Sequence, residues 1–431
     1  MEITLPYGHE TRTLRMPDGT NVHYLKSSDV SPLDDLSAEI RQGLANPLGG
    51  RRIADLLRPN TVAIAVPDET RPTPVREILH VLLDEIFGIW PDLPRKNVSI
   101  IVGGGLHEPA SADSMARIAP PESTLGCRVL AHDARNSAMA DLGITSRGTP
   151  VHINAHYAAA DLRIVVGQID PHQFMGFTGG SKGVTVGLAS PETIRHSHSL
   201  MLRDEARAGL LWENPAREDV SEAGRMVGIH LAVNVVLNAA KLPVWVGVGD
   251  PDAVLERGAG VCSAVYGVRI DNPYDLVLAS CGGYPKDICL YQAQKGLNMA
   301  SQAARSGGRV LLLAECGQGV GDDDYYSYVC RFENMDQAMD DFRKIGFRMG
   351  AHKAFLFGRS LARCEVVVDS ELDPEILRRC HLTPGKAQPT LDRWISMLPP
   401  GGRVAVIPNA NTTYFTFSRH GGPNGHGIHQ Q

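Results

Sequence analysis

Short runs of apolar, often β-branched residues alternate with helical patterns along most of the chain. The first series of runs covers residues 61–66, 98–102, 128–131, 162–167, 233–237 and 244–248. Runs of this length between turn residues are typical of strands, and strands that alternate with helices are typical of a parallel sheet. The pattern therefore predicts an α/β fold with a mostly parallel sheet.

A second series predicts a smaller doubly wound unit, also with a mostly parallel sheet. Its apolar runs cover residues 274–280, 309–314, 354–357 and 365–369, and its helical patterns cover 286–304, 336–345 and 391–397. The turn cluster Asp271-Asn272-Pro273 lies where a linker is expected. We therefore expect two domains, residues 1–270 and 271–405, and residues 406–431 could complete the first.

The two ends of the chain have simpler patterns. The first two dozen residues alternate and contain the turn pair Asp18-Gly19, which predicts a β-hairpin, and a helical stretch follows over residues 34–57. The apolar run 403–407 predicts a last strand, which could belong to either domain. The tail beyond it is rich in Gly, Asn and His and indicates a poorly ordered end rather than a metal site.

Composition fits a two-domain protein without a nucleic acid or a membrane as its partner. With 431 residues, 43% of them apolar, the chain has material for two hydrophobic cores. Its 42 basic and 48 acidic residues are mixed, so no basic stripe is available for a phosphate backbone. The first residues do not resemble a signal peptide, and no apolar run is long enough to span a bilayer. We expect a soluble cytoplasmic protein.

The cysteines indicate neither a zinc site nor a disulfide framework. All eight are scattered, and none forms a Cys-x-x-Cys pair. We expect reduced thiols with a structural role.

Polar loops follow three of the predicted strands, and ligands of open α/β sheets bind at this edge. After residues 61–66, the loop brings Asp68, Thr70 and Arg71 close together. It could be a capped helix start with a solvated Arg. The alternative is functional, because a guanidinium can bind a carboxylate with two hydrogen bonds.

The strand at 98–102 leads into Gly103-Gly104-Gly105, where glycines let the backbone approach a ligand, and then into His107. His107 is therefore a candidate acid or base. Pro109 and the missing second His exclude a zincin helix, and the glycine spacing does not fit a dinucleotide-binding fingerprint.

The densest loop follows residues 162–167. It contains His172, then Gly179-Gly180, then Lys182. The spacing is not that of a phosphate-binding loop, since Gly183 replaces the required Ser or Thr, and an NTPase is not expected. So many glycines around one Lys favour a functional loop over a structural one.

Two predicted helices carry further candidates. The first begins near Ser190-Pro191 and bears His196 and His198, which lie about 200° apart around the helix and cannot face the same site. On the helix within 286–304, Gln292 and Lys295 share a face near the helix start, although a solvated Lys would look the same.

Together and in this order, these segments resemble the signatures of the lactate racemase family. The matching motifs are Asp-x-Thr-Arg-Pro, Gly-x-His-x-Pro, a Pro-His loop that leads into Gly-Gly-x-Lys, a downstream His, and Tyr-Gln-x-x-Lys. The resemblance spans roughly residues 65–353. One departure is Val186-Gly187, where the family commonly has Pro-Gly.

The resemblance implies a cofactor, a nickel-pincer nucleotide. This is a pyridinium-3-thioamide-5-thiocarboxylic acid mononucleotide that holds nickel and is joined covalently to a lysine. Lys182 matches that lysine, and His198 matches the nickel ligand, which leaves His196 without a role. The positions that match cofactor-lining or supporting residues are Asp68, Thr70, Tyr291 and Gln292. Cofactor-maturation enzymes are the implied partners.

The resemblance also implies a reaction, the inversion of the hydroxyl-bearing carbon of a 2-hydroxy acid. His107 and His172 match the paired acid/base histidines, while Arg71 and Lys295 match residues that orient the substrate. One His would take the hydroxyl proton while the α-hydrogen leaves as hydride to the cofactor. The first domain would tether the cofactor, and the active site would lie in the cleft between the domains.

The substrate's side chain stays open between lactate, longer aliphatic acids, malate and aldonic acids. Two other functions are also compatible with an α/β chain of this kind. One is a binding or cofactor-maturation protein without catalysis, although such a protein needs no paired histidines. The other is a nicotinamide-dependent 2-hydroxyacid dehydrogenase, although the dinucleotide fingerprint is missing.

Overall fold

The computed structural model describes residues 1–417, and they divide into two compact units. The larger unit comprises Ser28–Val265 and Asp340–Arg348. The smaller unit comprises Met1–Ser27, Tyr266–Met339 and residues 349–417. Each unit is built on its own six-stranded sheet.

The sheet of the larger unit has the strand order β13-β12-β9-β4-β5-β6. All neighbours pair in parallel except β12 and β13, which are antiparallel. The mostly parallel sheet that the alternating pattern predicts is therefore confirmed. The strands are β4 (Val62–Pro67), β5 (Val98–Gly103), β6 (Arg128–Ala131), β9 (Leu162–Gln168), β12 (Leu231–Leu237) and β13 (Pro243–Gly249).

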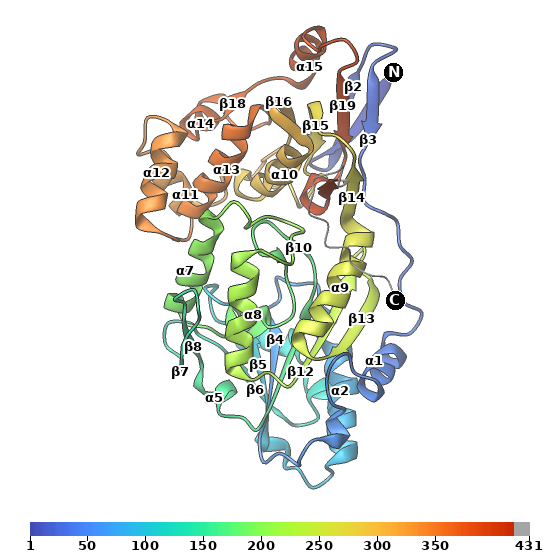
Figure 1. Cartoon of the computed structure of the whole chain (residues 1–431), viewed down its shortest axis with the longest axis vertical. Coiled ribbons are helices and arrows are strands. Elements are labelled where there is room, and N and C mark those ends of the chain that lie inside the picture. Colours follow the sequence, from blue (N-terminus) through green and yellow to red (C-terminus); the bar gives the residue numbers. More distant parts are fainter. Residues whose placement is uncertain (418–431) are drawn as a thin grey trace, which may run out of the picture. The chain divides into compact units, whose positions relative to one another are not determined.

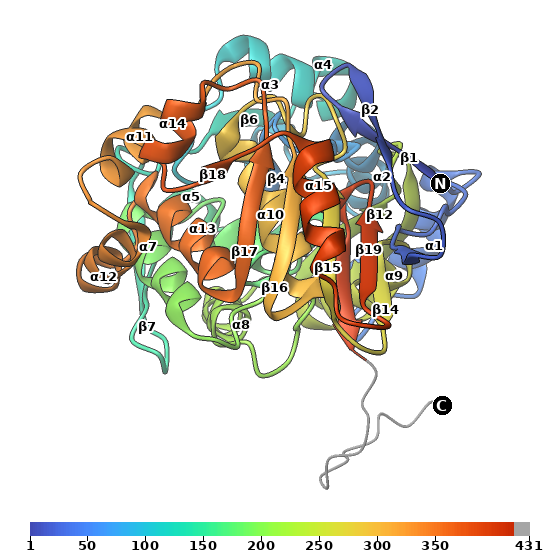
Figure 2. The same cartoon turned by 90° about the horizontal axis from the view of Figure 1, so that it is seen from above.

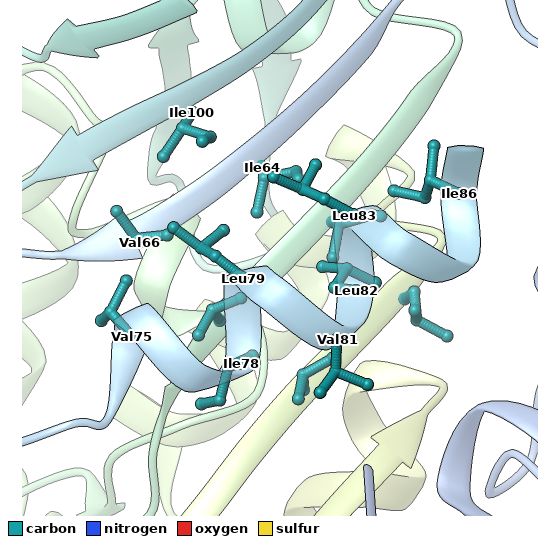
Figure 3. Packing of buried hydrophobic residues seen from close by; sticks show 14 of the residues in the cluster. Ile64, Val66, Val75, Ile78, Leu79, Val81, Leu82, Leu83, Ile86 and Ile100 are labelled. Atoms are coloured by element: carbon teal, nitrogen blue, oxygen red, sulfur yellow. The ribbon is translucent and has the colours of Figure 1, made fainter. Parts of the chain in front are cut away.

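Each face of this sheet is covered by its own apolar core, because successive side chains along a strand point to opposite faces. Ile64 and Val66 of β4 pack with Ile100 of β5 against the helix α2 (Val75–Ile89), as Figure 3 shows. On the other face lie Ala63 and Ala65 of the same strand. The helices whose side chains join this second core include α6 (Lys182–Thr185), α8 (Pro215–Val227) and α9 (Pro251–Tyr266).

The order of the strands creates a switch point in the larger unit. The chain runs from β4 outward through β5 to β6, and then returns to form β9 on the other side of β4. The loops that leave β4 and β9 therefore diverge at their carboxyl ends, where open α/β sheets bind their ligands. Figure 1 shows β4 and β5 within this unit, with α8 in front of them.

The smaller unit contains a second parallel sheet, with the order β18-β17-β16-β15-β19-β3. Figure 2 shows its strands side by side, with α15 over one face. This unit too matches the expected doubly wound architecture. The strands are β3 (Asn21–Tyr24), β15 (Tyr274–Ser280), β16 (Ala304–Leu313), β17 (Cys364–Asp369), β18 (Thr383–Pro384) and β19 (Arg403–Ile407).

Apolar side chains also anchor the elements that cover this second sheet. Ile3 and Leu5 of the strand β1 (Glu2–Tyr7) share a core with Leu391 and Trp394 of α15 (Ala387–Ser396). The helices α10 (Leu290–Ala303) and α13 (Ala351–Arg363) pack against each other and against β16.

The remaining elements are short. They are β2 (Glu10–Arg15), β7 (Met139–Ile144), β8 (Pro150–Asn154), β10 (Pro171–His172), β11 (Gly176–Phe177), β14 (Gly267–Ile270), β20 (Tyr414–Phe417), α1 (Leu36–Ala45), α3 (Ala112–Ile118), α4 (Pro121–Thr124), α5 (Ala155–Ala158), α7 (Pro191–Ser199), α11 (Asp323–Val329), α12 (Met335–Ile345) and α14 (Pro374–Arg379), with 3-10 turns at Ile53–Asp55, Arg95–Asn97, Leu200–Leu202 and Ala410–Thr412. No helix within residues 1–417 is long and apolar enough to cross a membrane.

Two local predictions are wrong, and the helical stretch predicted at 34–57 is reduced to α1 and a 3-10 turn at Ile53–Asp55. The hairpin at the start of the chain turns between β1 and β2, where Tyr7 pairs with Glu10, and not at Asp18-Gly19. Residues 354–357 form a turn of the helix α13 rather than a strand. Their apolar run suggested a strand because Phe355, Leu356 and Phe357 are all buried, and periodicity cannot distinguish a buried helical turn from a short strand.

The ends of the chain lie elsewhere than expected. We expected residues 1–27 in the first domain, but they lie in the smaller unit, since β3 pairs with β19. Residues 406–417 lie there too, because β20 pairs with β14, so they do not complete the larger unit. The predicted division after residue 270 is close to the observed one after Val265. The tail at 418–431 lies outside the described residues.

Candidate functional site

The loop after β4 holds an aspartate by hydrogen bonds on both of its oxygens. Oδ1 of Asp68 accepts from the Thr70 hydroxyl at 2.5 Å, and Oδ2 contacts Nδ1 of His107 at 2.7 Å. Burial of the carboxylate opposes its ionisation, but the hydrogen bonds from His107 and Thr70 outweigh burial, and the pKa of Asp68 is lowered. Asp68 is thus an anion beside an imidazole.

A glycine after β5 makes this contact possible. A Cβ at Gly104 would lie 2.7 Å from Oδ2 of Asp68 and 3.2 Å from Cβ of His107. Any side chain there would push the carboxylate away from the ring. The His107 side chain is 49% exposed and that of Asp68 only 13%, so the imidazole can reach a ligand while its partner stays covered.

Arg71 is exposed, and its backbone N–H donates to the carbonyl oxygen of Asp68 at 3.1 Å. Within residues 1–417 no carboxylate forms an ion pair with its guanidinium. The group is therefore available to bind the carboxylate of a ligand.

The loop after β9 begins with a short hairpin, β10–β11, that fixes His172. The Met175 backbone N–H donates to Nδ1 of His172 at 3.1 Å, and the ring lies edge-on against Phe174 at 4.6 Å between ring centroids. Burial lowers the pKa of His172 well below its usual value, and the charges of Lys182 and His198 lower it further. His172 is therefore neutral near pH 7.

Two glycines with left-handed backbone angles lead into α6. Gly179 and Gly180 have φ values of +83° and +56°, and the N–H of Gly180 donates to Oδ1 of Asn234 at 2.7 Å. Lys182 follows at the first position of the helix. Burial, and then the positive charges of Arg71 and Arg217, lower the pKa of Lys182 to about 7. A large fraction of its amine is therefore neutral, and a neutral amine is nucleophilic.

A buried arginine supports this loop from α8. Arg217 is 1% exposed, and its Nη1 donates to the carbonyl oxygens of Phe177 and Gly179, both at 3.3 Å. Its Nε and Nη2 have no hydrogen-bond partner among the described residues. Arg217 could not be predicted from the sequence, because a helical Arg is normally exposed and no local pattern marks a buried one.

The two histidines of α7 face different ways, as their spacing predicts. His196 is exposed and contacts the Thr149 hydroxyl at 3.3 Å. His198 packs edge-on against Phe174 and Phe347, with centroid distances of 5.3 and 4.9 Å. Burial and the charge of Lys182 lower its pKa to about 3 despite a hydrogen bond to the Ile194 backbone.

The larger unit therefore groups most of the predicted site residues. Asp68, Thr70 and Arg71 follow β4, and His107 follows β5. Three further members, His172, Lys182 and His198, follow β9, and the charge of Lys182 lowers the pKa of both His172 and His198. Positive groups outnumber negative ones here, which favours an anionic ligand. Within residues 1–417 no three His, Cys, Asp or Glu side chains converge to hold a metal.

The smaller unit holds the other predicted residues together on α10. Nζ of Lys295 donates to Oε1 of Gln292 at 2.9 Å, which confirms that the two side chains share a face. The hydroxyl of Tyr291 contacts Sδ of Met349 at 3.9 Å. These three residues lie at the start of the helix that follows β15.

A second lysine beside them was missed. Lys353 of α13 is buried, donates to Oε1 of Gln294 at 2.9 Å, and lies 4.5 Å from the ring centroid of Tyr291. Burial, and then the charge of Lys295, lower the pKa of Lys353 well below its usual value. The sequence predicts a strand at 354–357, and a strand there gives no sign that Lys353 faces α10. A strongly perturbed amine of this kind is typical of functional sites.

Two family models match the chain. Residues 7–209 match the family described as the lactate racemase N-terminal domain, and residues 270–412 match the lactate racemase C-terminal domain.

Two curated relatives are similar over most of the chain. A lactate racemase of Thermoanaerobacterium thermosaccharolyticum is 31% identical over 349 residues, which are 80% of this chain and 80% of that protein. A lactate racemase of Lactiplantibacillus plantarum is 28% identical over 420 residues, or 94% of this chain and 98% of that protein.

A solved structure is similar as well. The lactate racemase apoprotein of Thermoanaerobacterium thermosaccharolyticum superposes with a TM-score of 0.86 at 27% identity, covering 96% of this chain and all of that one.

Proposed function

The chain belongs to the lactate racemase family, whose members are isomerases of hydroxy acids, and we propose that it inverts the hydroxyl-bearing carbon C2 of a lactate-like 2-hydroxy acid. The observation that carries the proposal is a pair of histidines on the loops after β5 and β9, the two strands that flank β4 in one sheet. His107 is backed by the Asp68 carboxylate, and His172 is kept neutral by its surroundings. Neutral imidazoles can accept a proton and return it.

The implied nickel-pincer nucleotide fits the residues of the larger unit. The lowered pKa of Lys182 supplies the neutral amine that a covalent tether requires. His198 stays neutral near pH 7, as a metal-binding imidazole must, and a complex that brings its own sulfur and carbon donors needs only one protein ligand. The excess of positive groups around Lys182 would favour binding of the phosphate group of the nucleotide. We therefore propose Lys182 as the tether and His198 as the nickel ligand.

When bound, the nucleotide supplies an acceptor and donor of hydride for C2. The chain's own residues would manage the remaining chemistry. Arg71 would bind the substrate carboxylate, while His107 and His172 would be the acid/base groups that act on the substrate hydroxyl. Loss of the hydroxyl proton and of the C2 hydride leaves a 2-keto acid. Return of hydride to the opposite face of C2, with a proton to the oxygen, gives the other enantiomer.

The residues of the smaller unit would have supporting roles. We propose that Lys295 orients the substrate carboxylate and that Gln292, which holds its amine at 2.9 Å, fixes the direction of that amine. Tyr291 would line the cofactor, as would Asp68 and Thr70 of the larger unit. That the active site lies in a cleft between the domains stays a prediction.

The test uses protein made together with cofactor-maturation enzymes, the proposed partners. Single enantiomers of lactate, 2-hydroxybutyrate and malate are incubated with it, and the products are separated by chiral chromatography. We expect either enantiomer of the true substrate to become an equal mixture without a co-substrate, and the Lys182→Arg variant to be inactive.

Two outcomes would contradict the proposal. Net oxidation that requires added NAD would indicate a 2-hydroxyacid dehydrogenase. Stoichiometric nickel without inversion of any acid in the panel would indicate a binding or maturation protein.

A further inference from the structure

The two candidate acid/base histidines are held by hydrogen bonds of opposite direction. Nδ1 of His107 lies 2.7 Å from Oδ2 of Asp68, and Nδ1 of His172 lies 3.1 Å from the backbone nitrogen of Met175. A carboxylate can only accept, and a backbone N–H can only donate. These partners therefore decide which ring nitrogen carries hydrogen in each neutral imidazole.

For His107, the hydrogen lies on Nδ1. Asp68 is ionised because its hydrogen bonds lower its pKa, so the ring must donate to it. The Thr70 hydroxyl holds the other carboxylate oxygen at 2.5 Å, and Gly104 leaves room for the contact. The lone pair of neutral His107 is therefore on Nε2, at the far side of the ring from Asp68.

For His172, the hydrogen lies on Nε2. Its Nδ1 accepts from the Met175 N–H within the tight hairpin β10–β11, whose two strands pair His172 with Gly176. The edge-on contact with Phe174 restrains the ring as well. A hydrogen on Nδ1 would point at another N–H and break this bond.

We propose that the resting protein divides the work between the two rings: His107 accepts the hydroxyl proton at Nε2, while neutral His172 donates a hydrogen bond from Nε2 to the substrate oxygen. Asp68 and the Met175 N–H are the positioning groups. The roles rest on the proposed function, whereas the two tautomers are properties of the chain itself.

The division has a chemical consequence. When His107 gains the proton it becomes an imidazolium whose Nδ1–H still points at the Asp68 carboxylate, which stabilises the new charge. His172 polarises the carbonyl of the 2-keto acid without changing its own charge, as a neutral imidazole can. To accept a proton at Nε2, His172 must first give up its bond to Met175.

The test reads tautomers directly and needs no activity. Protein labelled with ¹⁵N histidine, without cofactor, is studied by long-range ¹H–¹⁵N correlation NMR at pH 7.5. The signals are assigned by their loss in His107→Gln and His172→Gln, with His196→Gln as the matched control. We expect hydrogen on Nδ1 in His107 and on Nε2 in His172.

A substitution then tests the positioning role of Asp68. In Asp68→Asn the amide can donate to Nδ1, so His107 should move to the Nε2–H form or to a mixture, while the pattern of His172 stays unchanged. The same tautomer in both rings of the unaltered protein, or a protonated His172, would overturn the proposal. Absence of racemisation with opposite tautomers would contradict only the proposed function.

Discussion

The guanidinium of Arg217 donates to the carbonyl oxygen of Gly179 at 3.3 Å, three residues before Lys182 in the chain. This bond joins a buried positive charge on α8 to the loop that leads into the lysine. Because Arg217 also lowers the pKa of Lys182, the contact links the shape of the loop to the reactivity of the amine.

Lys182 should be the most readily acylated lysine of the larger unit at pH 7 in protein without cofactor. Its pKa of about 7 leaves roughly half of its amine neutral, whereas an ordinary lysine has about one neutral amine in three thousand at that pH. Brief treatment with an acylating reagent, followed by peptide mass spectrometry, measures this. Equal labelling of Lys182 and Lys241 would contradict the prediction.

Replacing Arg217 with Met should slow that labelling. Removing a nearby positive charge raises the pKa of Lys182, and half a pKa unit would reduce the rate near pH 7 by about two- to threefold. Arg217→Lys keeps the charge and should retain most of the reactivity. The pH dependence of acylation in the three proteins gives the comparison, and an unshifted profile in Arg217→Met would exclude the electrostatic link.

His198→Ala should lose nickel, and His196→Ala should not. The neutral ring of His198 lies beside Phe174, whereas His196 is exposed and contacts Thr149. Metal analysis of protein made with the maturation enzymes should give about one nickel per chain in His196→Ala and in the unaltered protein. Full nickel content in His198→Ala would refute the ligand assignment.

Gly104→Ala should lower activity by about 10- to 100-fold with little loss of stability. The new Cβ would lie 2.7 Å from Oδ2 of Asp68 and would displace the carboxylate from His107. Gly88→Ala is the control, since a Cβ there meets nothing within 4 Å. Thermal unfolding should give similar stability for the two variants, whereas the racemisation rate should fall only in Gly104→Ala. Equal racemisation rates in the two variants would argue against a role for the Asp68–His107 pair.

A substrate deuterated at C2 should keep its label when it is inverted in ordinary water. Removal of that hydrogen as a proton would create a carbanion beside the substrate carboxylate. The cations we assign to that carboxylate, Arg71 and Lys295, would have to stabilise the added negative charge as well. Hydride transfer avoids the charge. Mass spectrometry of the inverted product after partial turnover, together with a primary isotope effect on the rate, tests this. Rapid washout of deuterium would refute hydride transfer even if racemisation occurs.

Much of the fold could be predicted because the central strands are buried on both faces. Residues 62–66 and 98–102 are entirely buried, and selection for burial leaves continuous apolar runs in the sequence. The site loops could be predicted for a related reason, since glycines and polar residues directly after such runs must lie at the ligand-binding edge.

The missed features depend on contacts between distant segments. Arg217 looks like any helical Arg until Phe177 and Gly179 supply its acceptors. Lys353 gains its significance from Gln294 and Tyr291 on another helix. No local pattern carries such information, because each of these side chains is placed by the packing of its helix.

The parallel pairing of β3 with β19 constrains the order in which this chain can fold during synthesis. Val22 leaves the ribosome early, but its partner Val404 is made some 20 to 75 seconds later at about 5 to 20 residues per second. The larger unit needs only the short segment 340–348 beyond its own continuous stretch. The larger unit can therefore fold first. The N-terminal hairpin and the edge strand β3 stay unpaired with their sheet until nearly the whole chain is translated, and during that time chaperones and proteases can reach them.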